Sequence, residues 1–499
     1  MDAVSLSFHR LTLAPPPARR IDAAPVLLPA LVILIGALLR LALLGVDVRL
    51  HPDEALFAAQ ARQISAWGDV LLRGTDLDKP PLAIYSVAAS FALLGPSEFA
   101  ARLPNVFASV LTLAALYRLA LALGGDRVTG LLAALLLALS PYDLAFAATA
   151  FTDVQATLWA VMAALLAARG RWALAGAVSA LMVATKLNAA LALPLIVALG
   201  LAQTSREDEP PRAALQRLGR FAGPLLIGLA LLALWDAARA PQSFWALNAA
   251  RNNPGRLIRS DELLPRLDAW AGWLHHLTGA RALNAALLTG AAAGIAIGGR
   301  ARTRAAAADR AIAAWAVAFL AAHWLIAVNT YDRYLHTLVP FLLLLGARGA
   351  VRAVRAGSLN PAASLGLLAL AVVAMSPGVI GALRGQAPLG GDRGRHTGID
   401  ALADYLNRQR AGAVIYEHDL GWELAFYLGE QPAALVVYSP QPEALAAEMA
   451  GRADTRYFAA PSARHAAPWL DALARAGVQS ALDYHDPAHG FVIYALIPR

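Results

Sequence analysis

The sequence predicts a polytopic α-helical membrane protein that carries a small α/β domain at its C-terminal end. Of its 499 residues, 58% are hydrophobic and only 15% are charged, whereas a soluble globular chain carries about a quarter charged residues. Apolar runs recur along the chain, and runs of about 17–25 residues are long enough to cross a bilayer. Cysteine is absent, so the chain has no disulfide and no thiolate metal site.

The first apolar run, 25–44, follows a polar, proline-rich segment with Arg10, Arg19 and Arg20. This run is long for the apolar core of a signal peptide, and no small-residue cleavage site stands out before it. We therefore expect a retained first span and a cytoplasmic N-terminal segment, 1–24, because arginines favour the cytoplasmic side. The charged loop after this span, from His51 to Pro81, is then external.

The topology depends on the short apolar segment 80–94, which can cross marginally or lie in the interface. If it lies in the interface, the later arginine clusters, beginning with Arg127, Arg169 and Arg171, all fall on the cytoplasmic side. If it crosses, they all fall outside, against the positive-inside rule. We therefore expect an interfacial helix here. The basic net charge of +8 then reflects topology, with no nucleic acid as a partner.

This topology gives about eleven spans within 25–384, a membrane domain in the cytoplasmic (inner) membrane. The expected spans are 25–44, 103–122, 128–147, 154–168, 172–185, 188–202, 221–236, 283–298, 311–328, 335–347 and 362–381. A long external loop, 237–282, is rich in aromatic residues, asparagine and histidine.

The composition changes after a linker that contains Gly390, Gly391 and Gly394. An amphipathic helix is expected over 400–410. Short runs typical of β-strands follow at 413–416, 434–438, 457–460 and 491–496. We expect residues 398–499 to form a small extracytoplasmic α/β domain.

The first candidate site residues are Asp53 and Glu54, directly after the first span. Asp53 is suited to cap the helix that resumes at Glu54, and equally suited to accept a proton from an acceptor hydroxyl. Asp78 and Lys79 precede two prolines that start the interfacial helix. Lysine is a good partner for phosphate, and Asp78 can orient it or hold a metal. A solvated loop is the structural alternative.

Further polar residues are predicted at the external ends of other spans. Asp153 is an acid between two apolar helices, either a functional residue or a helix cap, and Lys186 ends another span, where lysines also snorkel. Asp332, Arg333 and Tyr334 follow between two late spans, where Arg333 is suited to bidentate phosphate contacts and an aromatic belt is the alternative.

The adjacent His275 and His276 are weak candidates for a divalent metal ion, because they cannot share one helical face. The other candidates share one predicted location. Acids, lysines and an arginine gather at one side of the membrane, as a cavity for an anionic lipid-linked substrate requires.

These residues resemble the motifs of the GT-C membrane glycosyltransferases of the glycosyltransferase family 39 type. That group includes the protein O-mannosyltransferases and the aminoarabinose–lipid A transferases. The matching stretches are Asp53-Glu54, Gly68-Asp69, Asp78-Lys79-Pro80-Pro81-Leu82, the run from Glu98 to Pro104, Ala184-Thr185-Lys186 and Asp332-Arg333-Tyr334-Leu335.

The resemblance implies a GT-C fold and inverting transfer of a sugar from a polyprenyl-phosphate donor to a hydroxyl of a lipid, protein or glycan. It makes Asp53 the catalytic base, with Lys79, Arg333 and Tyr334 at the donor phosphate and Asp153 near the acceptor or a metal. The chain departs from the pattern at Leu56, where relatives often carry arginine.

Two alternatives use the same residues differently. A transporter or flippase of lipid-linked sugars would bind the same donor, but such proteins tend to show internal repeats and broken helices at the midplane. A scaffold that recruits envelope proteins through its external domain is the other alternative.

Overall fold

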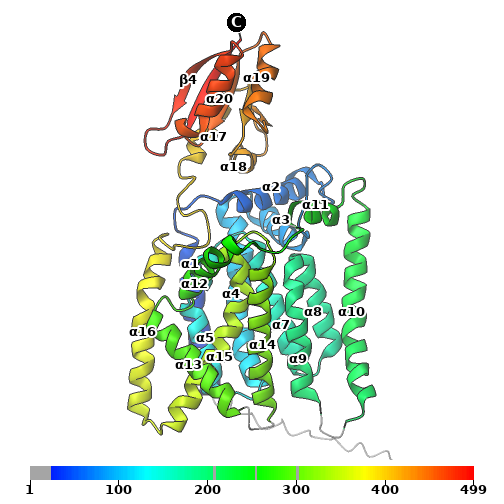
Figure 1. The fold of residues 1–499 in the computed structure, drawn as a ribbon, viewed down its shortest axis with the longest axis vertical. Coiled ribbons are helices and arrows are strands. Elements are labelled where there is room, and N and C mark those ends of the chain that lie inside the picture. Colours follow the sequence, from blue (N-terminus) through cyan, green and yellow to red (C-terminus); the bar gives the residue numbers. More distant parts are fainter. Residues whose placement is uncertain (1–23, 206–208, 253–254, 299–302, 499) are drawn as a thin grey trace, which may run out of the picture.

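The computed structural model describes residues 24–205, 209–252, 255–298 and 303–498, and almost all of the predicted segment 1–24 lies outside these ranges. A bundle of long helices carries short helices on one end, and an α/β domain sits beyond them (Figure 1).

Among the described residues, the bundle contains eleven helical units, one for each predicted span. They are α1 (Ala24–Leu43), α4 (Glu98–Ala122), α5 (Arg127–Leu139) with α6 (Pro141–Ala147), α7 (Thr152–Ala168), α8 (Trp172–Thr185), η1 (Leu187–Ala192) with α9 (Leu193–Thr204), α10 (Pro211–Ala237), α13 (Arg281–Gly298), α14 (Arg304–Leu325), η2 (Asp332–Leu338) with α15 (Val339–Ala356), and α16 (Pro361–Leu383). Within the described ranges, seven helices are long and apolar enough to cross a membrane, or eight if α5 and α6 form one span. The fold is thus polytopic and helical, and the count of eleven spans stays a prediction.

The span predicted over 128–147 is broken, because α5 and α6 meet at an angle of 59°. Pro141 is the first residue of α6 and has no N–H group to continue the helix, and the hydroxyl of Ser140 accepts from the backbone N–H of Asp143. The break removes the donors that would follow four residues after Leu137 and Ala138, so the Ala138 carbonyl has no helical partner and the Leu137 carbonyl keeps only the Ser140 N–H, at 3.3 Å. The guanidinium of Arg40 donates to both, at 3.2 Å each.

Arg40 also pairs with Asp143 at 2.5 Å, and both side chains are buried. Ser109 donates to Asp143 at 2.7 Å, and His336 Nε2 lies 3.2 Å from it. Four separate helices therefore meet at this charge pair. An unpaired charge is costly in a low-dielectric interior, so the pair fixes how these helices pack.

Four short helices lie at the end of the bundle nearest the α/β domain: α2 (Pro52–Trp67), α3 (Leu82–Leu94), α11 (Phe244–Asn252) and α12 (Ser260–His275) (Figure 1). The helix α3 occupies the predicted interfacial segment and packs against α2 and α4. The predicted long external loop 237–282 therefore contains two helices.

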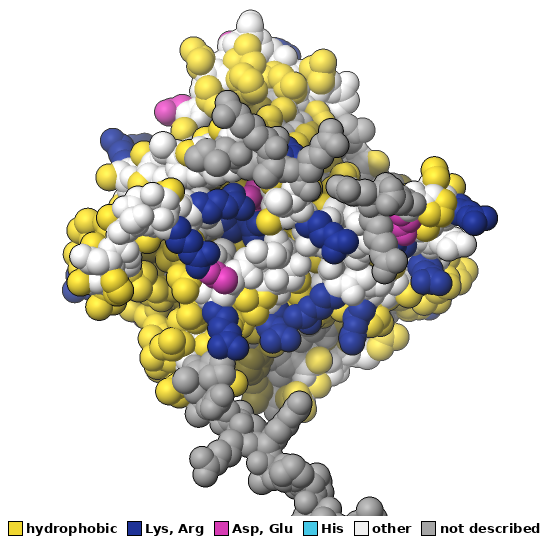
Figure 2. Space-filling model, turned by 90° about the horizontal axis from the view of Figure 1, so that it is seen from below, with side chains coloured by type: hydrophobic (Ala, Val, Ile, Leu, Met, Phe, Trp, Pro, Cys, Tyr) yellow, Lys and Arg dark blue, Asp and Glu magenta, His cyan; other side chains and the backbone are white. Residues whose placement is uncertain are grey.

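The opposite end of the bundle is basic, as Figure 2 shows by the dark-blue side chains gathered there. Arg355 pairs with Asp126 between α15 and α5, and Arg304 donates to the carbonyl of Ser205. These residues belong to the arginine clusters for which the sequence predicts a cytoplasmic location.

The C-terminal domain contains a five-stranded sheet in the order β2-β1-β3-β5-β4. Its elements are α17 (Ile399–Gln409), β1 (Val414–Glu417), α18 (Gly421–Tyr427), β2 (Leu435–Tyr438), α19 (Pro442–Ala450), β3 (Arg456–Ala460), α20 (Ala463–Arg475), β4 (Gln479–His485) and β5 (Val492–Ile497). The strand β1 pairs in parallel with β2 and β3, and β5 pairs antiparallel with β3 and β4. Four strands match predicted runs. The missed strand, β4, is a largely exposed edge strand that lacks an apolar run.

The domain docks on the bundle through α18, which packs against α2. Arg62 of α2 donates to the carbonyls of Ala425 and Phe426 at the end of α18. Tyr427 accepts from the backbone N–H of Leu50 at 2.8 Å and donates to Glu98 at 2.5 Å. The helix α2 is therefore held between the bundle and the domain.

We expect Arg40→Ala to lower the free energy of unfolding by about 3–5 kcal/mol, because Asp143 is left charged and buried. The loss would appear as a lower midpoint of thermal unfolding in detergent micelles. The double variant Arg40→Met/Asp143→Leu removes both charges and should recover only part of the loss, because the Ala138 carbonyl still lacks the donor that Arg40 supplies. Full recovery by the double variant would contradict the carbonyl-capping role of Arg40.

Candidate functional site

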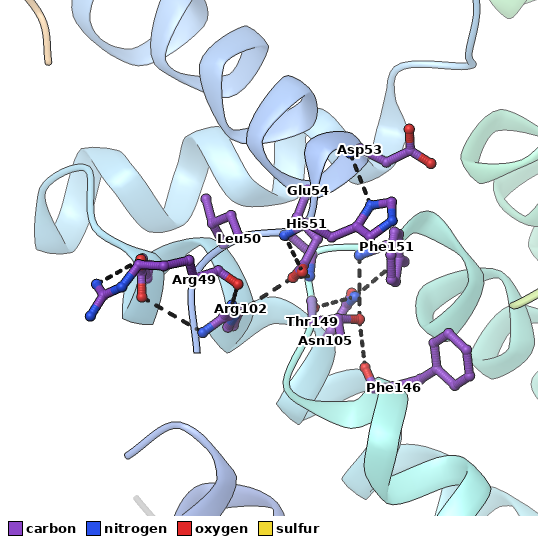
Figure 3. Close-up of polar contacts among 12 residues, drawn as sticks. Arg49, Leu50, His51, Asp53, Glu54, Arg102, Asn105, Phe146, Thr149 and Phe151 are labelled. Carbon is purple, nitrogen blue, oxygen red and sulfur yellow. Dashed lines mark hydrogen bonds and ion pairs between the residues drawn. The ribbon is translucent and has the colours of Figure 1, made fainter. Parts of the chain in front are cut away.

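The helix α2 begins at a capping box that sets the direction of two acidic side chains. His51 Nδ1 accepts from the backbone N–H of Asp53 at 3.1 Å, and Glu54 accepts from the backbone N–H of His51 at 3.0 Å. Pro52 fills the first helical position. His51 is thus the cap, and the alternative that Asp53 caps this helix is wrong because Pro52 and the His51 ring already complete the cap. Asp53 is left free to face elsewhere (Figure 3).

Glu54 points into the protein, away from Asp53 (Figure 3). It is fully buried, accepts from the backbone N–H of Ala150 at 2.7 Å and lies 3.5 Å from Arg102. Burial raises the pKa of Glu54, and the Arg102 guanidinium and the two backbone donors oppose that rise. Glu54 therefore joins α2 to the loop before α7 and acts in positioning.

The same loop is fixed from below by Asn105 of α4. Its amide nitrogen donates to the carbonyls of Thr149 and Phe151, at 2.7 Å each (Figure 3). The Phe151 ring meets the His51 ring edge-on, with centroids 5.2 Å apart. This packing sets the start of α7 against the start of α2.

Asp53 pairs with Arg333, whose terminal nitrogen lies 2.5 Å from the carboxylate. Aromatic rings surround the guanidinium: its central carbon is 4.1 Å from the centroid of Tyr331, 5.1 Å from Phe151 and 5.8 Å from Tyr334. Stacking on rings suits arginine better than lysine. The sequence-predicted base and phosphate ligand, 280 residues apart in the chain, are therefore in direct contact.

Lys186 and Asp153 form a second acid–cation pair, and the Lys186 ammonium also lies 4.8 Å from the centroid of the Tyr334 ring. Asp153 is the second residue of α7, whose cap, Phe151, makes no side-chain hydrogen bond. The alternatives for these residues, a helix cap and a snorkelling lysine, are therefore wrong. Both side chains are instead largely buried and paired with each other.

A third pair joins Lys79 and Asp78 at 2.6 Å. The amide of Asn252 donates to the Asp78 carboxylate at 3.2 Å, and that of Asn248 donates to the Asp78 carbonyl at 2.8 Å. Both amides come from α11, one helical turn apart. Asp78 thus orients Lys79, and its Oδ2 accepts from both Lys79 and Asn252.

All three pairs line one cavity of about 1360 Å³ between the bundle and the C-terminal domain, together with Tyr334. The chain has only two lysines, Lys79 and Lys186, and both are in this lining. Leu56, which stands where relatives often carry arginine, lines it too.

Four predicted residues lie outside this lining. Glu54 and Asp332 hold the framework: Asp332 accepts from the backbone N–H groups of Arg333 at 2.8 Å and Gly390 at 2.9 Å. His275 and His276 pack ring against ring near α6, where the His276 carbonyl accepts from the Tyr142 N–H. Among the described residues no group of three histidine or acidic side chains is arranged to hold a metal ion.

Other lining residues were not predicted. The α11 amides Asn248 and Asn252 lie in the predicted external loop, and their spacing of four residues is the only sequence signal for a shared face. The C-terminal domain contributes an entire wall, from α18, β2 and the loop after β1. Contacts this distant in the chain carry no local sequence signal.

A buried acidic cluster supports that wall. His396 Nδ1 lies 2.5 Å from Asp392, and its Nε2 lies 3.0 Å from Glu423 of α18. Burial raises the pKa of Glu423 to about 7, although His396 opposes the rise. Burial alone lowers the pKa of His396, but its hydrogen bond to Asp392 and the Glu423 carboxylate raise it above the ordinary value.

Comparison with known proteins gives one sequence family and several similar structures. Residues 78–210 match the sequence model of the dolichyl-phosphate-mannose-protein mannosyltransferase family. No match was found among curated protein sequences. ArnT from Cupriavidus metallidurans in the apo state has a TM-score of 0.62 and 17% identity, covering 94% of this chain and 97% of ArnT.

The same ArnT bound to undecaprenyl phosphate gives a TM-score of 0.63 at 15% identity, covering 95% of this chain and 98% of that one. The Archaeoglobus fulgidus oligosaccharyltransferase in the apo form gives 0.53 at 13% identity, covering 96% of this chain and 75% of the other. At these identities the likeness establishes the fold. Together with the family match, it confirms the resemblance to the GT-C membrane glycosyltransferases.

We expect the docking of the C-terminal domain to weaken as pH rises from about 5 to 8. The folded pKa values of both Glu423 and His396 lie above their ordinary values of 4.5 and 6.5. The docked state therefore holds more protons than an undocked one, and its advantage is lost as pH rises through these values. Hydrogen exchange of the α18 amides, corrected for intrinsic rates, should report less protection at the higher pH.

Glu423→Gln cannot ionise and should flatten the part of this profile between about pH 4.5 and 7. Glu443→Gln, at an exposed position in the first turn of α19, is the matched control and should keep the native profile. Protection that stays constant or increases with pH would contradict the assignment.

Proposed function

We propose that this protein is a glycosyltransferase that moves a sugar from a polyprenyl-phosphate donor to a hydroxyl acceptor. The reaction would take place at the outer face of the cytoplasmic membrane, with inversion, and Asp53 would be the base. One observation carries the proposal: a carboxylate and the cations Lys79, Lys186 and Arg333 share one cavity at the end of a membrane bundle. The mannosyltransferase family match and the ArnT complex with undecaprenyl phosphate support a lipid-phosphate donor.

Arg333, Lys79 and Tyr334 are assigned to the donor phosphate. Arginine binds phosphate through a planar fork of donors, whereas lysine contributes a compact charge. Lys186 adds positive charge from the neighbouring wall. Leu187, Leu191 and Ile326 line the cavity near the membrane helices, and the last two are exposed on the bundle surface. We infer that the polyprenyl chain leaves the cavity beside them.

In the reaction, the acceptor oxygen attacks the anomeric carbon while the bond from that carbon to the phosphate oxygen breaks. The acceptor proton moves to Asp53, and polyprenyl phosphate leaves with both electrons of the broken bond. The sugar passes through an oxocarbenium-like state. Cations placed beforehand at the leaving phosphate stabilise the charge that develops there.

The Asp53–Arg333 pair implies that the donor binds before Asp53 accepts the proton. Arg333 donates to Asp53 Oδ2 at 2.5 Å. A phosphate that attracts Arg333 would free this oxygen, so the base becomes available when the donor is in place. The aromatic rings around the guanidinium would keep it within reach of both partners.

A flippase would use the same cavity but would form no new glycosidic bond. Mass spectrometry of the lipid that copurifies with the protein identifies the donor, and transfer to a hydroxyl acceptor in proteoliposomes separates the two functions. Translocation of the lipid-linked sugar without transfer would favour the alternative.

We expect Asp53→Asn to reduce sugar transfer by about 10²- to 10⁴-fold, because the acceptor proton loses its base. Binding of polyprenyl phosphate should persist or become tighter, because Arg333 no longer pairs with a carboxylate. Asp47→Asn, at an exposed position before α2, is the control and should leave both properties unchanged. Unaltered transfer by Asp53→Asn would refute the assignment of the base.

We expect Arg333→Gln to weaken binding of polyprenyl phosphate about 10- to 100-fold, as loss of a charge-assisted hydrogen bond implies. Binding is measured by labelling amines with a reactive reagent and identifying the labelled residues by mass spectrometry. Apart from the N-terminal amine, the only amines of the chain are Lys79 and Lys186, and both line the cavity. Bound polyprenyl phosphate should protect Lys79 and Lys186 in the native chain at concentrations that no longer protect them in Arg333→Gln. Arg408→Gln, on the exposed face of α17, serves as control; equal protection in all three chains would exclude a phosphate contact.

A further inference from the structure

The C-terminal domain forms one wall of the cavity. This wall lies where a separate ligand site is expected. This wall, here called the roof, comprises the lining residues of α18, β2 and the loop after β1. The strand β1 lies between β2 and β3, and the chain passes from β1 to β2 and then crosses to β3 on the other side. This reversal is a topological switch point, and ligands of open α/β sheets bind beyond the carboxyl ends of strands there.

The roof presents hydrogen-bond acceptors. Asp419, directly after β1, is exposed and lines the cavity. His418 Nδ1 lies 2.9 Å from the carbonyl of Ser439. A carbonyl only accepts, so Nδ1 carries the proton and Nε2 of the neutral ring is an acceptor. A ligand that bonds to Asp419 and to His418 Nε2 must supply donors to them.

The roof also exposes aromatic rings. Trp422 and Tyr438 are 48% and 60% exposed although both line the cavity. The His418 ring stacks on Tyr438, with centroids 5.4 Å apart and planes 19° from parallel. Exposed rings of this kind, beside a few polar groups, are typical of a surface that binds a ligand with one apolar face and polar edges.

The roof contains acidic side chains and no basic ones. Among the described lining residues that the domain contributes, none is lysine or arginine, and the acids are Glu417, Asp419 and Glu423. Of these acids only Asp419 is exposed, and the cations that suit a phosphate, Lys79, Lys186 and Arg333, lie on the other side of the cavity. A phosphorylated acceptor would be repelled by Asp419 and would find no cation at the roof, which is unfavourable.

We propose that the roof binds the acceptor and that this acceptor is an uncharged carbohydrate, a deduction that rests on the proposed function. Sugar hydroxyls supply the donors that Asp419 and His418 require, and the apolar face of a sugar ring fits Trp422 or Tyr438. A glycan held there presents its hydroxyls to a cavity whose opposite side carries Asp53. The roof thus selects the acceptor, and the bundle binds the donor.

The test measures glycan binding separately from sugar transfer. Purified full-length protein in nanodiscs is applied to an array of neutral oligosaccharides, phosphorylated or carboxylated oligosaccharides, and unstructured peptides rich in serine and threonine. We expect binding to neutral members, weakened about threefold to tenfold in Trp422→Ala, as loss of a stacking contact implies. Leu482→Ala on β4, also exposed, is the matched control and should bind as the native chain does.

Asp419→Lys reverses the charge of the roof and should weaken binding of neutral members without creating binding to anionic ones. Binding restricted to anionic members or peptides, binding to no member, or neutral binding that Trp422→Ala leaves unchanged would each overturn the proposal. Protection of Lys79 and Lys186 by polyprenyl phosphate is measured on the same samples. Protection without glycan binding refutes the roof alone, whereas absence of protection refutes the donor site.

Discussion

The buried pair of Arg40 and Asp143 is the interaction on which the site depends. It lies where the span of α5 and α6 breaks, and Arg40 supplies donors to the carbonyls that the break exposes. A broken helix inside a membrane requires such replacement partners. The break directs the chain through Thr149 and Phe151, and this segment holds the start of α2 through Glu54. A charge pair deep in the bundle therefore sets the direction of Asp53 at its surface.

The cavity contains three acid–cation pairs: Asp53 with Arg333, Asp153 with Lys186, and Asp78 with Lys79. Each carboxylate balances one cation, so the cations are held close together without an anionic ligand. Like charges gathered in this way would otherwise repel one another and favour an open site. Under the proposed function, the pairs preorganise the cavity for the donor phosphate, which would replace the carboxylate partner of a cation.

The sequence was sufficient to predict the helices of the bundle and the charged residues of the three pairs, because each of these predictions rested on a local signal. Asp153 and Lys186 interrupt apolar runs, Asp53 and Lys79 belong to the charged loop after the first span, and Arg333 belongs to a polar segment between two late spans. Pro141 was the missed sign of the broken span. The pairing of residues hundreds of positions apart has no local signal, nor does the roof, which forms only when the C-terminal domain docks.

The helix α2 connects the two sides of the cavity. Its first turn carries Asp53, and further along it Arg62 holds the end of α18, the helix that bears Trp422. Asp53 and the roof are therefore fixed to the same rigid element, while Arg333 and Lys79 come from other segments of the chain. A change in domain docking would move the roof relative to these cations. Under the proposed function, the acidic cluster of His396 and Glu423, which supports α18, would then alter transfer without contacting either substrate.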